Sequence, residues 1–442
     1  MALHYHWPLK QLDISNAFLH GTLDEEVYMT QPPGFVSSSS PHHVCKLQKA
    51  LYGLKQAPRA WYSTFSKFLL SHGFVNSHCD NSLFVHRTST TITVLLVYVD
   101  DILLTGNSPS HLQALIHQMQ SVFAMKELGD LSYFLGISIQ AVGDSYFLSQ
   151  SKYASDILLK AGMTSCKPCP TPMSIKLVDT PAANLPFHQP QLYRSLVGAL
   201  QYLTLTRPDL SFAVNQACQY MHAPTNAHFT LLKCILRFVQ SSLSHGLTFH
   251  PSSFELQAFS DSNWASDTVD RKSTSGYCVF LGSNIISWSA KKQPTVSRSS
   301  TEAEYRSFAH ATAELSWLQM LLHDLSLPLV TTPILWCDNL SAIALASNPV
   351  FHTRSKHIEV DCHFIRDKIA SKKLLLYYLP SAEQIADIFT KPLSVAQFQY
   401  LQFKLLVTSP PIRLQGDDKT LSAAVSLHQM ALQQAQELKL VS

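Results

Sequence analysis

The chain has 442 residues, of which 46% are hydrophobic and 14% charged, a composition that excludes a disordered protein and allows two or three domains. Its net charge of +3 is too small to predict a nucleic-acid partner without motifs. With no visible signal peptide, no apolar run near the ~20 residues that span a bilayer and no secreted-type cysteine spacing, we expect an intracellular protein without a membrane partner, in a cytoplasmic particle or the nucleus.

The first informative element is a strand-like segment around a single carboxylate. In QLDISNAF (residues 11–18), Leu12, Ile14 and Ala17 surround Asp13 with apolar side chains. A lone aspartate in such a segment is weak evidence for a functional site. Asp13 supports a functional site only if a second acid elsewhere in the chain is predicted to lie beside it.

Such acids follow in VLLVYVDDILLTGN, residues 94–107, where Asp100 and Asp101 interrupt an apolar run. Two adjacent carboxylates repel, and burying either one unpaired costs several kcal/mol. One interpretation is a hairpin turn at Asp100–Asp101, because Asp is common in turns. The other is a hairpin tip that presents both carboxylates to divalent cations, a pair of which ~4 Å apart can assist phosphoryl transfer. That chemistry needs a further carboxylate from a neighbouring strand, and Asp13 is the candidate.

Changes of composition and periodicity divide the chain into five blocks. A Pro-, Ser- and Thr-rich segment without periodicity is typical of a linker, and it separates a mixed strand–helix block from a mainly helical one. The predicted blocks are residues 1–160 (mixed), 161–192 (linker), 193–250 (helical), 254–403 (alternating strand and helix) and 404–442 (a tail ending in a surface helix).

The 254–403 block predicts a hairpin followed by a long helix. SGYCVFLGSNIISWSAKKQ (275–293) favours two strands turning at Gly282–Asn284. In the helix that follows, Ser299 and Glu302 form a capping-box signature. Apolar side chains at mostly helical spacing predict the face that packs on a sheet. They are Tyr305, Phe308, Leu315, Leu318 and Leu322.

Four acids of this block lie near predicted strand ends or helix starts. Asp261 closes the strand of FELQAFSDSNWAS (254–266), Glu304 lies in the first helical turn, Asp338 follows the strand of PILWC, and Asp387 lies on the helix predicted after LLLYYLP. Each alone is equally explained as a cap or surface acid, because acids are favoured near helix N-termini.

Five ordered segments carry a family resemblance: QLDISNAFLHG, QPPGF (31–35), ALYGLKQAPRAWY (50–62), LLVYVDDILLTGN and LGDLSYFLGI (128–137). They closely resemble the reverse transcriptase of copia-type LTR-retrotransposon Pol polyproteins, from Lys10 to about Phe403. The resemblance implies a reverse-transcriptase palm, an antiparallel sheet with helices, over residues 1–160 with partial fingers, and a helical thumb or connection over 193–250. It implies that Asp13, Asp100 and Asp101 are catalytic and bind metal.

The same resemblance implies substrate contacts. Phe18 matches a gate against the ribose 2′-hydroxyl, with a plain core phenylalanine as the alternative. Gly53 would let the backbone approach the incoming nucleotide, with a simple turn glycine as the alternative. Lys55, Gln56 and Arg59 would contact phosphate, base or template, and the alternative for each is a solvated side chain.

The order of elements in the 254–403 block resembles the RNase H fold, a mixed sheet with helices, so the fold class of the chain is α+β to α/β. The resemblance implies that Asp261, Glu304, Asp338 and Asp387 are catalytic and metal-binding. Several basic side chains of the block would follow the phosphates of an RNA–DNA hybrid. They are Arg271, Lys272, Lys291, Lys292 and Arg298.

The implied function is an RNA-directed DNA polymerase, a nucleotidyltransferase, with a linked ribonuclease H, an endonuclease. Each active site would use two Mg²⁺ (or Mn²⁺) ions, and the partners would be an RNA template, a DNA primer, an RNA–DNA hybrid and deoxynucleoside triphosphates. Asp13 comes only thirteen residues into the chain, so we expect a truncated copy without the upstream fingers. Two alternatives stay open: a catalytically inactive nucleic-acid-binding remnant, and a protein in which only the RNase H site works.

Overall fold

The computed structural model describes residues 1–174, 180–327, 329, 331–347 and 358–410. The surface helix predicted at the end of the 404–442 tail lies outside the described residues. The chain forms two units: the first contains residues 1–134 and 320–327, and the second contains the remaining described residues. In these described parts, no helix combines the length and hydrophobicity needed to cross a lipid bilayer.

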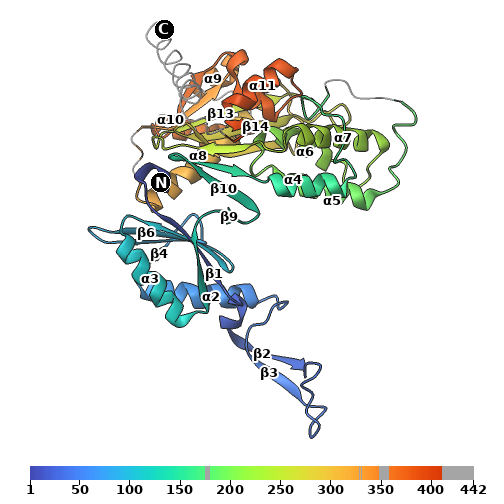
Figure 1. Cartoon of the computed structure of the whole chain (residues 1–442). Coiled ribbons are helices and arrows are strands. Elements are labelled where there is room, and N and C mark those ends of the chain that lie inside the picture. Colours follow the sequence, from blue (N-terminus) through green and yellow to red (C-terminus); the bar gives the residue numbers. More distant parts are fainter. Residues whose placement is uncertain (175–179, 328, 330, 348–357, 411–442) are drawn as a thin grey trace. The chain divides into compact units, whose positions relative to one another are not determined.

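The first unit is built on a six-stranded, fully antiparallel sheet with the order β4-β5-β6-β7-β1-β8. Figure 1 shows the two longer helices of this unit, α2 and α3, on the same side of the sheet. The sheet and these helices comprise β1 (Leu9–Ile14), α2 (Ala57–Ser71), β4 (Val75–Asn76), β5 (Leu83–Arg87), β6 (Ile92–Tyr98), β7 (Asp101–Gly106), α3 (Pro109–Val122) and β8 (Met125–Asp130).

Smaller elements complete the first unit. A separate antiparallel hairpin of β2 and β3 extends away from the six-stranded sheet (Figure 1). The elements are α1 (Ala2–Tyr5), η1 (Ala17–His20), β2 (Thr22–Thr30), β3 (Val44–Lys49) and β9 (Tyr133–Phe134).

The core of the first unit lies between the sheet and the two helices. Strand residues Leu12, Ile14, Ile102 and Leu104 are fully buried there with apolar side chains of α2 and α3. Successive side chains of a strand point to opposite faces, so the residues between these positions belong to the other face of the sheet. That second face carries Asp13 and Asp101, which are both half-buried.

The second unit begins with strands and a helical layer. Strands β10, β11, β12 and β18 are neighbours in one antiparallel sheet, and the helices pack around a shared apolar core. These elements are β10 (Ile137–Val142), β11 (Ser145–Ser149), α4 (Ser151–Lys160), α5 (Pro190–Leu203), η2 (Pro208–Leu210), α6 (Ser211–Cys218), α7 (Asn226–Ser241), β12 (Gly246–Phe249), α11 (Val395–Lys404) and β18 (Val407–Thr408).

The second sheet of this unit is mixed, with the order β15-β14-β13-β16-β17. Its first three strands are antiparallel, whereas β16 runs parallel to β13 and β17 parallel to β16. Its elements are β13 (Leu256–Asn263), β14 (Thr274–Leu281), β15 (Asn284–Lys292), α8 (Ser300–Asp324), β16 (Ile334–Cys337), α9 (Leu340–Ser347), α10 (Glu359–Ala370), β17 (Leu375–Tyr378), η4 (Ser381–Glu383) and η5 (Ile385–Phe389).

These two architectures confirm the predicted fold class, an antiparallel palm sheet with helices and an RNase H-like mixed sheet with helices. The hairpin of the mixed sheet turns at Gly282–Ser283, where Gly282 has φ 58° and Asn284 already belongs to β15. The predicted apolar face of α8 is buried throughout, at Tyr305, Phe308, Leu315, Leu318 and Leu322.

The predicted cap of α8 is present in a slightly shifted form. The backbone N–H of Glu302 donates to Ser299 Oγ at 3.2 Å, as a capping box requires. The Glu302 carboxylate, however, accepts from the N–H of Arg298 at 2.9 Å, one residue before the expected donor. Glu302 therefore serves the helix terminus, which leaves Glu304 without a capping role.

Candidate functional sites

The first cluster of acids is assembled by strand pairing. In the β1–β7 register Asp13 is directly opposite Asp101, and opposite residues of antiparallel strands share one face. The N–H of Ile14 donates to the carbonyl oxygen of Asp100 at 2.9 Å, which joins the hairpin tip to β1. The structure thus brings Asp13, Asp100 and Asp101 together at the tip of the hairpin, where all three are half-buried.

The hairpin that carries the two neighbouring acids turns one residue earlier than the turn interpretation assumed. Tyr98 pairs with Asp101, so Val99 and Asp100 form the loop and Asp101 is the first residue of β7. Val99 has φ 57°, a left-handed conformation that is strained for a β-branched residue. Its carbonyl accepts a 2.7 Å hydrogen bond from the indole N–H of Trp61, which is 2% exposed. Trp61, from the ALYGLKQAPRAWY segment, is a positioning residue that the sequence did not single out.

Electrostatic repulsion remains in this cluster. Burial raises the pKa of Asp101, and the neighbouring charges of Asp100 and then Asp13 raise it further, while a hydrogen bond with Gln11 acts in the opposite direction. On the other side of β1, Lys126 of β8 is directly opposite Asp13. Half-buried carboxylates that repel one another are suited to hold a cation between them.

The residues expected to contact the nucleotide lie near α2. Phe18 is half-buried on η1, with its ring 4.6 Å from that of Tyr52 and against the apolar core of the unit. This packing agrees with the core interpretation without testing the gate. Gly53 has φ 96°, which strains any other residue, yet no atom lies within 4 Å of where a Cβ would be. The turn therefore needs glycine and leaves open space beside it.

The polar residues of the same segment flank the start of α2. Lys55 and Arg59 are exposed, whereas Gln56 is half-buried and serves as the N-cap residue of α2. The helix passes very close to η1, because a Cβ on Gly21 would lie 2.8 Å from the backbone nitrogen of Trp61. Gly21, in QLDISNAFLHG, thus allows the contact that places α2 against the hairpin tip. Contact of Lys55, Gln56 and Arg59 with substrate stays a prediction.

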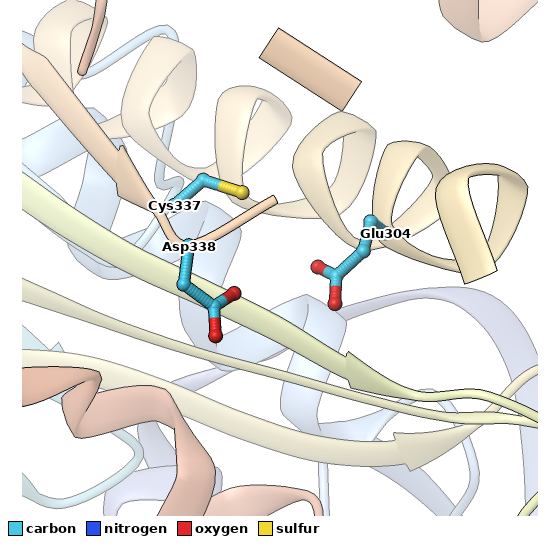
Figure 2. A group of neighbouring side chains, drawn as sticks. All are labelled: Glu304, Cys337 and Asp338. Carbon is cyan, nitrogen blue, oxygen red and sulfur yellow. The ribbon is translucent and has the colours of Figure 1, made fainter. Parts of the chain in front are cut away.

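The second cluster of acids lies on the mixed sheet. Asp261 is on β13, Glu304 is on α8, Asp338 directly follows β16 and Asp387 is on η5. A cleft of about 390 Å³ is lined by three of these acids, Asp261, Glu304 and Asp338, together with Lys391 and neighbouring polar residues. Figure 2 shows the Glu304 carboxylate on α8 pointing toward the carboxylate of Asp338.

Glu304 is the most deeply placed acid of the cluster. It is 5% exposed, and its Oε1 accepts from the N–H of Ser262 at 3.2 Å. Its Oε2 is buried and has no hydrogen-bond partner. Burial, followed by the charges of Asp261 and Asp338, raises the pKa of Glu304 well above its usual range. A buried carboxylate oxygen without a partner, facing other acids, is unfavourable unless a cation joins it.

Asp261 and Asp387 share a single lysine. Lys391 Nζ lies 2.8 Å from Asp387 Oδ1 and 3.4 Å from Asp261 Oδ2, and the hydroxyl of Thr390 also donates to Asp261 Oδ2. Burial and the charge of Asp261 raise the pKa of Asp387 to about 7 despite the lysine. Asp387, which was expected on a helix, lies on the short 3₁₀-helix η5, and the side chain of Gln384 caps the start of this helix.

Cys337 also lies beside this cluster. Single ligand atoms of Glu304, Cys337 and Asp338 lie within 4.8 Å of one another (Figure 2). Burial raises the pKa of the Cys337 thiol, and the N–H of Asn339 donates to its sulfur at 3.0 Å. The thiol is therefore protonated at neutral pH, and the carboxylates are the donors suited to a hard cation.

Buried polar side chains hold the strands and helix of the cluster together. Gln293 Nε2 donates to Ser275 Oγ at 2.8 Å, to the carbonyl of Ala303 at 2.9 Å and to Ser262 Oγ at 3.3 Å. The hydroxyl of Ser307 donates to the carbonyl of Asp261 at 2.9 Å. Ser262 and Ala303 are chain neighbours of Asp261 and Glu304, so this network sets the spacing between β13 and α8.

Two of the predicted phosphate-binding lysines are already paired. Lys292 Nζ lies 2.6 Å from Asp267 and 3.0 Å from Asp270, and Lys272 lies 3.6 Å from Asp270. Their charge is therefore largely compensated within the protein. Arg271, Lys291 and Arg298 are exposed, and they stay the better candidates.

Both clusters fit Mg²⁺ or Mn²⁺ by donor chemistry. Mg²⁺ binds through oxygen ligands, usually one or two carboxylates with water and substrate phosphates. The first cluster offers Asp13, Asp100 and Asp101, and the second offers Glu304 with its unpartnered oxygen alongside the other acids. The structure thus brings all seven predicted acids into two groups, while their catalytic role stays a prediction.

The sequence matches known proteins along most of its length. A family model described as reverse transcriptase (RNA-dependent DNA polymerase) matches residues 1–175. The retrovirus-related Pol polyprotein from transposon RE2 of Arabidopsis thaliana is 49% identical over 414 residues, which are 93% of this chain and 28% of that polyprotein. The putative transposon Ty5-1 protein of Saccharomyces cerevisiae is 31% identical over 310 residues, which are 69% of this chain and all of that protein. The chain thus spans little more than a quarter of the plant polyprotein.

A solved structure also aligns with the chain. The foamy viral protease-reverse transcriptase in complex with RNA/DNA hybrid covers 92% of this chain and 47% of its own, with 12% identity and a TM-score of 0.46. Because this superposition is distant, family membership rests on the sequence relatives.

Proposed function

Because the chain belongs to the family of copia-type retrotransposon Pol polyproteins, we propose that it is an RNA-directed DNA polymerase with a linked ribonuclease H. The observation that supports this most is the formation of two separate carboxylate clusters from residues far apart in the sequence. Asp13 meets Asp101 through strand pairing, and Asp261 lies in one cleft with Glu304 and Asp338.

At the first cluster, the protein positions a primer end and an incoming deoxynucleoside triphosphate on an RNA template. Asp13 and Asp101 present carboxylates from two neighbouring strands, while the strained Val99–Asp100 loop is held by Trp61. Lys126, opposite Asp13, supplies positive charge beside the acids, where the triphosphate would lie. The open space beside Gly53 leaves room for the nucleotide at the start of α2.

At the second cluster, the same type of chemistry would cleave the RNA strand of an RNA–DNA hybrid. Asp261, Glu304 and Asp338 would face the attacked phosphate from the cleft, with Asp387 held beside them through Lys391, and the network of Gln293 and Ser307 keeps β13 and α8 at a constant spacing. Pairs of Mg²⁺ or Mn²⁺ ions at either cluster would activate the attacking oxygen and neutralise the charge that develops on the phosphoryl group. An RNA strand differs from DNA by its 2′-hydroxyl and by duplex shape.

The test is to assay primer extension and hybrid cleavage separately with Mg²⁺. We expect Asp100→Asn to lose extension by at least a hundredfold and to retain cleavage, and Asp338→Asn to show the reverse. Asp144→Asn, an exposed acid of the β10–β11 turn, is the matched control and should change neither activity.

The outcomes separate the alternatives. A folded wild-type protein that performs neither reaction contradicts the proposal and supports a nucleic-acid-binding remnant. Cleavage without extension leaves only the ribonuclease H part of the proposal in place.

A further inference from the structure

A lysine occupies one end of the second acid cluster. Lys391 lines the cleft and contacts Asp387 and Asp261 at once, at 2.8 and 3.4 Å. Its side chain is 34% exposed, whereas those of Asp261 and Asp387 are 4% and 12% exposed. The ammonium group therefore bridges two nearly buried carboxylates and still has access to solvent.

The other end of the cluster differs. In the described part of the chain, no lysine or arginine lies within ion-pair distance of Glu304 or Asp338. Asp338 Oδ2 accepts a hydrogen bond from Ser381 Oγ at 2.7 Å, and Glu304 Oε2 has no partner. One end of the cluster thus already contains a cation, and the other contains a buried oxygen that lacks one.

A divalent cation cannot bind between Asp261 and Asp387 while the ammonium stays there, because the two positive charges repel and would share the same oxygen atoms. At the Glu304–Asp338 end the ammonium acts only at longer range, through its charge, and does not occupy the oxygen atoms that an ion would use. A lysine carries its charge at the end of a flexible four-carbon chain. Because the Lys391 side chain is 34% exposed, its ammonium group can move away from the two carboxylates toward solvent.

We propose that Lys391 is a built-in cation that holds the Asp261–Asp387 end of the cluster and makes the second divalent ion bind more weakly than the first. This inference rests on the proposed two-ion ribonuclease H site. Two divalent ions already balance four ionised carboxylates, so the ammonium is surplus charge until a phosphate enters the cleft. Binding of the second ion is thereby coupled to binding of nucleic acid.

The experiment measures Mn²⁺ binding to the full chain by electron paramagnetic resonance and calorimetry, without any substrate. Asp13→Asn and Asp101→Asn are placed in every protein so that the first cluster does not contribute. In this background we expect one tight and one weak Mn²⁺ ion. Lys391→Met, which keeps the side-chain length and removes the charge, should strengthen the weak ion at least tenfold.

A matched control uses another lysine of the same unit. Lys404 also pairs with an acid, Glu383, outside the cluster, so Lys404→Met should leave both Mn²⁺ affinities unchanged. Lys391→Arg retains the charge and should keep the second ion weak. If Lys391→Met fails to fold, as judged by circular dichroism in EDTA, Lys391→Arg decides, because its planar fork pairs two carboxylates more firmly and should weaken the second ion further.

Failure of this inference differs from failure of the proposed function. If the background protein binds no Mn²⁺ and Asp338→Asn changes nothing, the metal site itself is refuted. If the background protein binds two ions and Lys391→Met leaves both affinities unchanged or lowers them, the metal site stands and the role of Lys391 is overturned. A fall in affinity would mean that Lys391 only keeps Asp387 in place.

Discussion

Asp13 on β1 is the direct cross-strand neighbour of Asp101 on β7. Two like charges in this relationship destabilise a sheet, so the pairing costs free energy in the absence of a cation. The same pairing places two oxygen donors on one face at the tip of the hairpin. The acids of the second unit show the same conflict, because Glu304 has a buried oxygen without a partner beside other carboxylates.

Asp101→Asn is expected to stabilise the metal-free protein and to abolish primer extension. Repulsion from Asp100 and Asp13 and burial raise the pKa of Asp101, so its ionised form is unfavourable in the folded state. Removing the charge should raise the free energy of unfolding by about 0.5 kcal/mol, the scale of one cross-strand pair. Urea denaturation in EDTA measures this, with Asp144→Asn as the neutral control. A less stable Asp101→Asn protein would contradict the proposed repulsion.

Trp61→Phe is expected to slow extension without affecting hybrid cleavage. The change keeps most of the apolar packing of Trp61 but removes its hydrogen bond to the Val99 carbonyl. One such bond contributes about 1 kcal/mol, and the loop that carries Asp100 would lose its anchor. We expect kcat/KM for primer extension to fall about fivefold. Trp264→Phe removes an indole hydrogen bond to Ser297 in the second unit, so it is a control that should spare extension.

The metal-free protein should lose stability as pH rises from about 4 to about 7. The pKa of Asp387 is raised from 3.8 to about 7 by burial and Asp261, and that of Glu304 is raised by burial and its acidic neighbours. Groups with a higher pKa in the folded state bind more protons when folded, so this stability is complete at low pH and is lost as they ionise. Thermal unfolding with EDTA should show this fall.

Divalent ions should offset the loss of stability that the metal-free protein shows as pH rises. A larger share of the acids is ionised at pH 8 than at pH 6, so protons compete less with Mg²⁺ at pH 8 and its binding stabilises the folded state more. The increase in Tm on adding Mg²⁺ should therefore be larger at pH 8 than at pH 6. An equal increase at both values, or none in wild type, would be inconsistent with ion binding by these acids.

Gln293→Ala should weaken Mg²⁺ binding at the second acid cluster, because Gln293 holds β13 and α8 together. The side chain is 2% exposed and donates to Ser262, Ser275 and Ala303, so its loss leaves buried polar groups without partners. We expect a destabilisation of about 3 kcal/mol and a higher Mg²⁺ concentration for half-maximal hybrid cleavage. Gln399→Ala, an exposed glutamine of α11, is the control. Cleavage with an unchanged Mg²⁺ requirement would show that Gln293 is only structural.

Local patterns were sufficient to predict several elements. Apolar spacing predicted the buried face of α8, and the Ser299–Glu302 signature predicted its start, because both depend on residues within a few positions of each other. Patterns failed where the structure depends on pairing. The hairpin turn is at Val99–Asp100, since the register with β6 makes Asp101 a strand residue.

The sequence by itself determined which acids are present, in which order the motifs follow and which family the chain belongs to, because these are properties of the residues alone. Only the tertiary structure decided that Trp61 supports the Val99 carbonyl, that Lys126 is opposite Asp13 and that Lys391 bridges Asp261 and Asp387. The physical reason is that strand register and helix packing bring together side chains that are far apart in the sequence and follow no regular spacing. A charge acquires its electrostatic partner only when the chain folds.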